Sequence, residues 1–365
     1  MSSSVIARAA APRLLSTSVV GSHALPGWFW TALESIKAGT YGQTDVREVM
    51  DDAVNAAVRD QERAGIDVIT DGEMRRWYFV QGFYGRFTGL EELPPLRTQG
   101  VYGYDSPPRY RVQGKVTVPT GLGIVDEYRY LVQQTERAIK MTCPGPLTLT
   151  IHMQTRRGDA YDGDRVALAF EMAEVVNREL HALADAGCDF IQLDEPSYSI
   201  IPGATEEWIT LYNSAVRGLQ AKGVRLGLHV CFGNLGSRPR GRRRYRWMFP
   251  ELLAATADQV VLEFANREMI ELDLLSELVR AGKDVGAGVV DVKSFYVEPP
   301  EEVAERVREC LQHVSPERLT LVPDCGFFQL PRWLCVAKLK NLVAGVHLVR
   351  RELEGRGLEG QGLEG

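Results

Sequence analysis

Residues 189–196 read DFIQLDEP, and residues 225–231 read RLGLHVC. Each stretch is a short, mainly apolar run that ends in polar side chains, as a buried strand of a parallel sheet does. Between them, residues 204–221 have an amphipathic pattern followed by Gly223, a typical helix stop. This strand–helix–strand unit predicts a parallel sheet that is covered by helices.

The same unit recurs along the chain. Strand-like runs are predicted at eight places: 18–21, 67–70, 140–143, 189–193, 225–230, 259–264, 284–290 and 318–322. Helical patterns between and after them cover 45–64, 165–186, 204–221, 268–281, 300–313 and 334–352. No Gly-rich dinucleotide motif follows the first strand, so the α/β pattern favours a closed (β/α)8 TIM barrel over an open, doubly wound sheet.

Three segments depart from this pattern. Residues 98–121 alternate Tyr and Val and carry paired prolines, so we expect a hairpin inserted after the second strand–helix unit. Residues 1–14 are expected to form a flexible N-terminus. Residues 353–365 repeat Gly-Leu-Glu-Gly and are expected to form a disordered tail. Residues 15–352 would then form a single barrel domain.

The composition is that of a soluble globular protein, with 45% hydrophobic and 25% charged residues. A net charge of −6 argues against general nucleic-acid binding. No apolar run approaches the roughly 20 residues needed to cross a membrane, and no secretory signal is apparent. The cysteines lack the spacing of a disulfide framework, so we expect reduced thiols and a cytoplasmic protein; they are residues 143, 188, 231, 310, 325 and 335.

Chemically active side chains gather at the carboxyl ends of the predicted strands. In a parallel barrel, loops at this end build the active site. The residues selected on this basis are Ser22, Asp71, Glu73, Asp194, Glu195, His229, Cys231, Glu263, Asp291 and Cys325.

Four of these side chains predict a metal site. His229 and Cys231 lie two residues apart on one strand and therefore face the same side. Glu263 ends the sixth strand and Cys325 the eighth, so all four ligands can converge above the barrel. Two thiolates, an imidazole and a carboxylate suit zinc better than magnesium or calcium. The competing interpretation is two buried structural cysteines beside a hydrogen-bonded core histidine.

Charged groups at the same face suggest a substrate site. Glu73, Asp194 and Glu195 could bind an ammonium group or act as acid and base, although an acid at a strand end also serves as a helix cap. Residues 238–246 carry six arginines and could hold a phosphate, a sulfonate, a polyglutamate or an acidic partner protein. A solvated basic loop is the alternative.

These motifs resemble the catalytic half of cobalamin-independent methionine synthase, in order from Thr17 to Leu348. The matching stretches are VVGS (19–22), DGE (71–73), QLDEP (192–196), HVCFGN (229–234), LE (262–263) and PDCG (323–326). The resemblance implies zinc held by His229, Cys231, Glu263 and Cys325. It implies homocysteine bound through its amino and carboxyl groups by Ser22, Glu73 and Asp194, beside the backbone of Val20 and Gly21.

Two departures from that family bear on the methyl donor. The folate-dependent enzymes carry a second barrel, whereas this sequence shows one. Where they have a histidine after the seventh strand, this chain offers Lys293. The pattern resembles the short, core-type enzymes, and therefore favours a methylcorrinoid, either methylcobalamin or a corrinoid protein, over methyltetrahydrofolate. Asp291 and Lys293 are then the candidate catalytic residues that orient or stabilise the donor's leaving group.

The expected reaction is methylation of homocysteine to methionine through a zinc-bound thiolate, with Glu263 moving aside to admit the sulfur. A second interpretation is a zinc-dependent alkyltransferase for another thiol, such as an epoxyalkane:coenzyme M transferase, which shares the scaffold. A third is a zinc-binding or partner-docking barrel without activity. Glu73 and Asp194 favour an amino-acid thiol, because carboxylates pair with an ammonium group.

Overall fold

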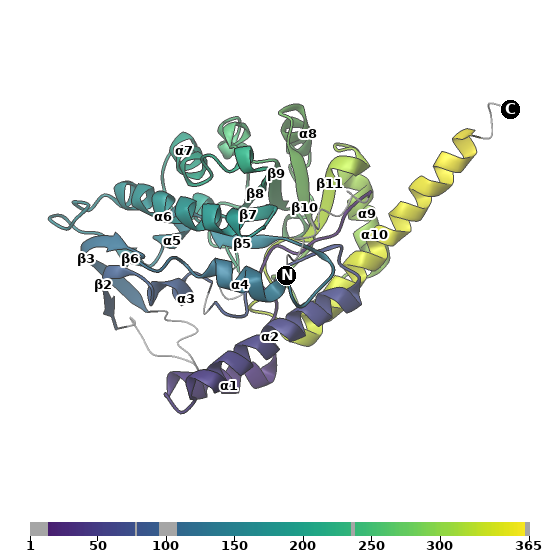
Figure 1. Cartoon of the computed structure of the whole chain (residues 1–365). Coiled ribbons are helices and arrows are strands. Elements are labelled where there is room, and N and C mark those ends of the chain that lie inside the picture. The colour runs from purple at the N-terminus through teal and green to yellow at the C-terminus, as the bar shows by residue number, and fades with distance from the viewer. Residues whose placement is uncertain (1–13, 77–78, 95–107, 235–237, 362–365) are drawn as a thin grey trace.

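Parallel strands form the centre of the molecule in the computed structural model, which describes residues 14–361 apart from 77–78, 95–107 and 235–237 (Figure 1). The largest sheet has the order β11-β10-β9-β8-β7-β5, and each neighbouring pair is parallel. Its strands are β5 (Met141–Pro144), β7 (Phe190–Asp194), β8 (Arg225–Val230), β9 (Gln259–Glu263), β10 (Asp284–Val290) and β11 (Leu319–Pro323).

Short pairings close this sheet into the predicted barrel. β1 (Val68–Ile69) runs parallel to β4 (Ala138–Ile139), which is separated from β5 by one residue. On the other side, Thr17 bridges to Leu321 of β11 and Ser18 bridges to Val68 of β1, both in parallel. The ring therefore has eight members, counting residues 17–18 as the first strand and β4–β5 as the third. Strand interiors such as Leu228 and Leu262 are fully buried.

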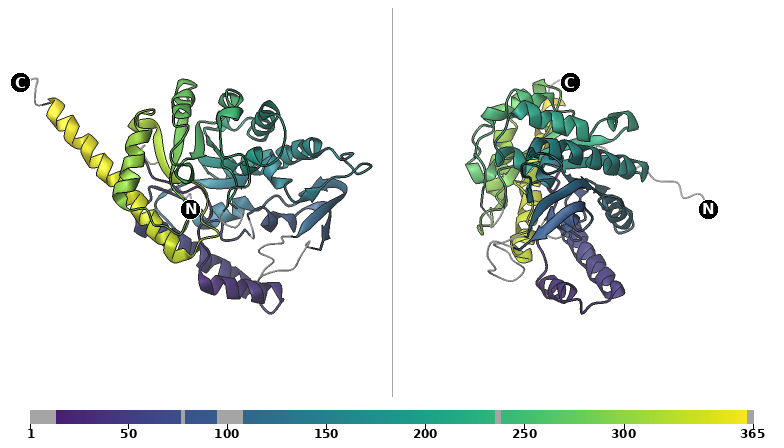
Figure 2. Two further views of the ribbon diagram at one scale, coloured as in Figure 1. Left: turned by 180° about the vertical axis from the view of Figure 1, so that it is seen from behind. Right: turned by 90° about the vertical axis from the view of Figure 1, so that its left-hand side faces the viewer.

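Helices surround the strands (Figure 2). The helices predicted over 45–64, 165–186 and 300–313 lie close to those positions, whereas the one predicted over 204–221 ends at Ala215 and the one predicted over 268–281 begins at Asp273. The predicted helix stop Gly223 has a positive φ, which glycine adopts without steric cost, and so do Gly65, Gly187 and Gly282, which follow three other predicted helices. Asp164 caps one helix by accepting hydrogen bonds from the N–H groups of residues 166 and 167. The helices are α1 (Gly27–Lys37), α2 (Gln43–Ala64), α3 (Gln81–Tyr84), α4 (Ile124–Leu131), α5 (Pro146–Leu149), α6 (Arg165–Asp185), α7 (Thr205–Ala215), α8 (Asp273–Arg280), α9 (Pro300–Cys310) and α10 (Arg332–Gln361).

The inserted hairpin is present, but its bounds differ from the prediction. β2 (Thr88–Leu93) pairs antiparallel with β3 (Arg109–Thr117), and β3 also pairs with β6 (Met153–Gln154). The first strand thus begins before residue 98, and part of the predicted range lies outside the described residues. Along the chain, the hairpin follows β1 and α3 and precedes α4.

The C-terminal segment also differs from the expectation of a disordered tail after residue 352. Helix α10 continues to Gln361 and extends beyond the barrel (Figure 2), while residues 362–365 and 1–13 lie outside the described residues. Within the described ranges, every helix is too short or too polar to span a bilayer.

A buried cluster connects the loop after the first strand to two helices. The Nε2 atom of His23 lies 3.1 Å from Asp60 of α2, and its Nδ1 atom lies 3.3 Å from the sulfur of Cys335 in α10. Arg332 completes the cluster by donating to Asp60 at 2.6 Å. Burial alone would lower the pKa of His23, but Cys335 and Asp60 together raise it from 6.5 to about 9.

We expect this cluster to make stability depend on pH. A histidine whose pKa rises on folding stabilises the fold fully below its unfolded pKa, and the contribution disappears as pH rises through the folded value. His23 should therefore contribute up to about 3 kcal/mol near pH 6, lost by about pH 9. Urea unfolding of wild type and His23→Gln at several pH values measures this contribution as their difference. A difference that stays constant from pH 6 to pH 9 would contradict the assignment.

Candidate metal and substrate site

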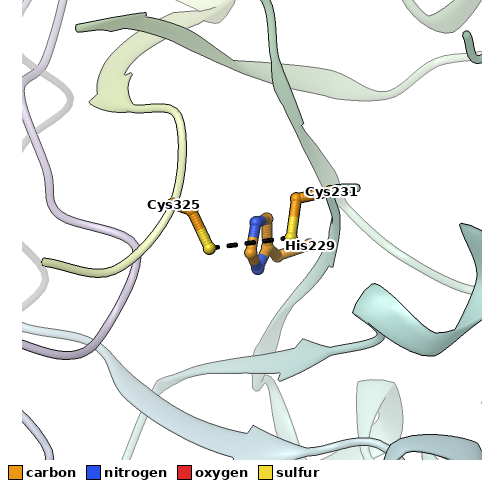
Figure 3. Close-up of side chains that lie close together, drawn as sticks. All are labelled: His229, Cys231 and Cys325. Carbon is orange, nitrogen blue, oxygen red and sulfur yellow. Dashed lines mark hydrogen bonds between the residues drawn. The ribbon is translucent and has the colours of Figure 1, made fainter. Parts of the chain in front are cut away.

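Three of the four predicted metal ligands converge at the carboxyl ends of the strands (Figure 3). His229 lies at the end of β8, Cys231 follows that strand, and Cys325 follows β11. One ligand atom from each lies within 4.8 Å of the other two. The imidazole lies beside the two thiols in the figure, so the three side chains point toward one small volume.

His229 is oriented for metal binding by a carboxylate. Its Nδ1 atom lies 2.9 Å from Oδ1 of Asp194, while its Nε2 atom is buried and has no hydrogen-bond partner among the described residues. Burial alone would lower the pKa of His229, but the hydrogen bond with Asp194 raises it. Most metal-binding histidines donate their second nitrogen to such a partner, which fixes the ring and leaves the other nitrogen for the ion.

The two thiols face each other as free cysteines. The Sγ atoms of Cys231 and Cys325 are 3.6 Å apart, and neither residue forms a disulfide. The hydrogen bond with Cys231 lowers the pKa of Cys325 to about 7, against the effect of burial, whereas the pKa of Cys231 is raised. One thiolate of the pair is thus accessible near neutral pH, as a soft metal ligand requires.

Glu263, the fourth predicted ligand, ends β9 but lies outside this group of three. Its side chain is fully buried. Oε2 accepts a hydrogen bond from the ammonium group of Lys293 at 2.8 Å and a longer one from the N–H of Phe232 at 3.3 Å. Oε1 has no partner in the described part of the chain. One oxygen is therefore held by the protein, and the other is left for a ligand.

A cavity of about 470 Å³ opens beside these residues. This volume is within the range of small-molecule sites. Its lining includes the predicted metal ligands His229, Cys231 and Cys325 and all five predicted substrate-binding residues: Val20, Gly21, Ser22, Glu73 and Asp194. Asp291, Lys293 and Glu263 are not part of the lining. Apolar side chains form much of the remaining wall, including Phe79, Val80, Ile151, Ile200 and Phe328.

Two carboxylates face this cavity with different partners. Glu73 is buried and accepts hydrogen bonds from Thr142 at 2.7 Å and Arg76 at 3.3 Å. Burial raises the pKa of Glu73 to about 7. Asp194 uses Oδ1 to accept from Gln192 and to hold His229, while its buried Oδ2 has no partner in the described ranges. The pair can therefore accept N–H donors from a cationic ligand.

Backbone close to Glu73 leaves no room for a further side chain. A Cβ atom at Gly21 would clash with the carboxylate of Glu73. Thr70 fixes the same loop by donating to the carbonyl oxygen of Gly21 at 2.8 Å. This close approach explains why glycine stands between Val20 and Ser22 in the predicted substrate loop.

Two other selected carboxylates have structural partners. Glu195 accepts hydrogen bonds from the N–H groups of Leu147 and Thr148 and from the Thr148 hydroxyl, and so caps the first turn of α5. Glu195 is therefore a helix cap, the alternative role considered for these acids, and the helix that it caps is distant in sequence. Asp71 accepts from the N–H of Glu73 at 2.9 Å and thereby holds that loop.

Sequence reasoning missed two buried cations near the site. Arg76 lines the cavity and bonds to Glu73, Glu127 and Thr142. Lys140 donates to the carbonyl oxygen of Val19 at 2.6 Å and to Gln192 at 2.7 Å. Burial lowers the pKa of Lys140 to about 8. The sequence did carry a signal for Lys140, because it is a lysine at the start of an otherwise apolar predicted strand.

The arginine-rich loop divides into two parts. Arg243 bonds to Asn266, and Arg246 forms ion pairs with Asp273 and Glu277, so these two have partners within the chain. Arg240 instead lines the cavity. Part of the loop, residues 235–237, lies outside the described residues.

Comparison with known proteins identifies the family of this chain. Residues 15–347 match the family model for the cobalamin-independent synthase catalytic domain. The methionine synthases of Thermococcus kodakarensis and Sulfurisphaera tokodaii are each 34% identical to this chain over 94% of its length, covering 96% and 95% of their own lengths. The B12-independent methionine synthase of Shewanella sp. W3-18-1, solved with selenomethionine, is 28% identical, with a TM-score of 0.77 over 94% of this chain and 100% of that one. The chain therefore belongs to the cobalamin-independent methionine synthase family and is a methyltransferase with the catalytic barrel of that family.

Proposed function

We propose that this enzyme binds one zinc ion and uses it to methylate homocysteine to methionine. His229, Cys231 and Cys325 would hold the ion, with Glu263 as the fourth ligand. The observation that carries the proposal is the buried Nε2 atom of His229, which has no partner within the described ranges, on a ring that Asp194 fixes beside two free thiols. This donor set matches a catalytic zinc site, in which one position exchanges with substrate.

When bound, zinc would lower the pKa of a coordinating thiol, so that the substrate sulfur is a nucleophile at neutral pH. The protein's own residues would orient that substrate. Glu73 and the free oxygen of Asp194 are suited to its ammonium group. Ser22 and the backbone beside it would bind the carboxylate. Placing the substrate by both groups fixes the position of its sulfur beside the metal ligands.

The methyl transfer is a displacement at carbon. The thiol proton leaves to solvent, the sulfur lone pair forms the new bond to the methyl carbon, and the bond from that carbon to the donor breaks with its electrons going to the donor. The apolar side chains of the cavity would exclude water from this step.

Two features favour a methylcorrinoid donor over methyltetrahydrofolate. A folate nitrogen leaves poorly unless it is protonated, whereas the reduced cobalt of a corrinoid leaves without a proton. Lys293, at the place of the folate enzymes' histidine, is bound to Glu263 and does not line the cavity. His152 does line it, but burial lowers its pKa to about 4, so it is a neutral imidazole and a poor acid.

Assays with pairs of donors and acceptors test this proposal. With the zinc-loaded enzyme, we expect methionine from homocysteine and methylcobalamin, and a rate at least about 100-fold lower with methyltetrahydrofolate, because the general acid is missing. Coenzyme M in place of homocysteine should give no product, since its sulfonate cannot pair with Glu73 and Asp194. Equal rates with both donors would overturn the donor assignment. Methylation of coenzyme M but not of homocysteine would overturn the assignment of homocysteine as the thiol substrate.

The paired thiols also bear on where the enzyme works. Two cysteines 3.6 Å apart must stay reduced to bind a metal ion. This requirement favours a reducing compartment, and we infer a cytoplasmic enzyme on that ground.

A further inference from the structure

The pairing of Lys293 with Glu263 has a consequence for exchange at the metal site. Their ion pair is almost completely buried, with 2% and 0% of the two side chains exposed. The two charged groups are 2.8 Å apart, so the ammonium group of Lys293 lies beside the carboxylate that would have to exchange.

We propose that Lys293 is a positioning residue that keeps Glu263 charge-paired whether or not Glu263 binds the metal, so that the substrate thiolate can displace it. The proposal rests on the proposed function. Without Lys293, a displaced Glu263 would be a buried carboxylate with only the longer hydrogen bond from Phe232. An unpaired buried charge is strongly unfavourable, so displacement would be opposed.

The two oxygens of Glu263 divide these tasks. Oε2 is held by Lys293, and Oε1 is a buried atom without a partner among the described residues. The carboxylate can therefore offer Oε1 to a metal ion while Oε2 keeps its contact. The Lys293 backbone is itself fixed, because its N–H donates to Asp291 at 2.7 Å. This gives Asp291 and Lys293 a role on the metal side of the site, in place of the predicted contact with the donor.

Charge predicts opposite effects on the two ligands that the site would bind. Removing one positive charge next to a cation site reduces repulsion of the metal ion and so strengthens its binding. The same removal weakens binding of an anionic thiolate for two reasons. The thiolate loses a nearby positive charge, and the Glu263 that it displaces is left without a cationic partner. A loss of local structure would instead weaken both. The signs of the two changes therefore distinguish this role from a purely structural one.

The test uses cobalt(II), whose visible absorption reports thiolate ligation, in the full chain. For Lys293→Met, we expect the cobalt affinity, measured by competition with a chelator, to equal or exceed that of wild type. The dissociation constant for homocysteine, measured from the change in cobalt absorption, should rise by about 10-fold or more. Lys293→Arg keeps the charge and should restore homocysteine binding for the most part.

A matched control is available at the opposite end of β10. Lys283 precedes β10 as Lys293 follows it, is also buried, and donates to the carbonyl oxygens of Ala255 and Ala257. Lys283→Met should change neither affinity. If Lys293→Met lost affinity for both cobalt and homocysteine, or changed in neither, the inference would be overturned. The proposed zinc site would still stand, because wild-type protein would bind the metal. Wild-type protein that bound no cobalt would overturn the proposed function and the inference with it.

Discussion

Cys325→Ser should lose both zinc and activity while the barrel stays folded. A serine hydroxyl is not ionised at neutral pH and is a poor ligand for zinc, so the variant keeps at most three of four ligands. Loss of a residue that only orients a ligand costs about 10-fold to 100-fold in metal affinity. Loss of the ligand itself should therefore cost more than about 100-fold. Zinc analysis after dialysis should give about one ion per chain for wild type and almost none for the variant.

The control is a buried cysteine outside the site. Cys310 lies in α9 and is fully buried. Cys310→Ala should keep its zinc and its methyl transfer, because it removes a thiol without touching the ligands. A Cys325→Ser variant that retained stoichiometric zinc would remove the basis of the proposed mechanism. Unfolding curves for both variants would show whether the fold itself has changed.

The barrel could be predicted because its signals are local. Each strand is a short apolar run, and α2, α6 and α8 are each closely followed by a glycine that the structure places at positive φ. The positions of His229 and Cys231 also follow from local geometry, because residues two apart on a strand share a face. Placing Cys325 beside them needed only the rule that parallel strands end on one side of a barrel.

Pairings between side chains distant in sequence could not be predicted in this way. The strand ends indicate that Glu263 and Lys293 lie near each other, but they do not give the directions of the two side chains. The sequence therefore suggested a metal ligand and a donor-side lysine, whereas the structure joins them as an ion pair. The bounds of the hairpin were predicted wrongly for a different reason. Its first strand, β2, reads TGLEEL, which lacks the alternation of a half-buried strand.

Arg76 is the clearest residue that sequence analysis missed, because its partners come together only in the folded chain. Its guanidinium donates to Glu127 at 2.7 and 2.9 Å, to the carbonyl and hydroxyl of Thr142 at 2.7 and 2.9 Å, and to Glu73 at 3.3 Å. It also stacks over the ring of Phe83, with 5.5 Å from its central carbon to the ring centre. One buried cation thus holds two buried carboxylates, one of which faces the substrate cavity.

Arg76→Met should destabilise the fold by about 3–5 kcal/mol at neutral pH, because it leaves Glu73 and Glu127 as buried charges without a cation. Burial already raises the pKa of both carboxyls while Arg76 opposes it, so their pKa values should rise further in the variant. Protonation at low pH removes the unpaired charge, and the deficit should shrink as pH falls toward 5. Urea unfolding of wild type and Arg76→Met at pH 5 and pH 7.5 measures this difference in the free energy of unfolding.

The same substitution should weaken homocysteine binding, because Glu73 would lose the partner that holds its carboxylate toward the cavity. A second variant separates this effect from stability. Adding Glu127→Gln to Arg76→Met removes one of the two unpaired charges, so the double variant should be more stable than Arg76→Met alone. Glu73 is unchanged in both, and homocysteine binding should stay weak. If the double variant were no more stable than Arg76→Met, the uncompensated charge of Glu127 would not be a cause of the destabilisation.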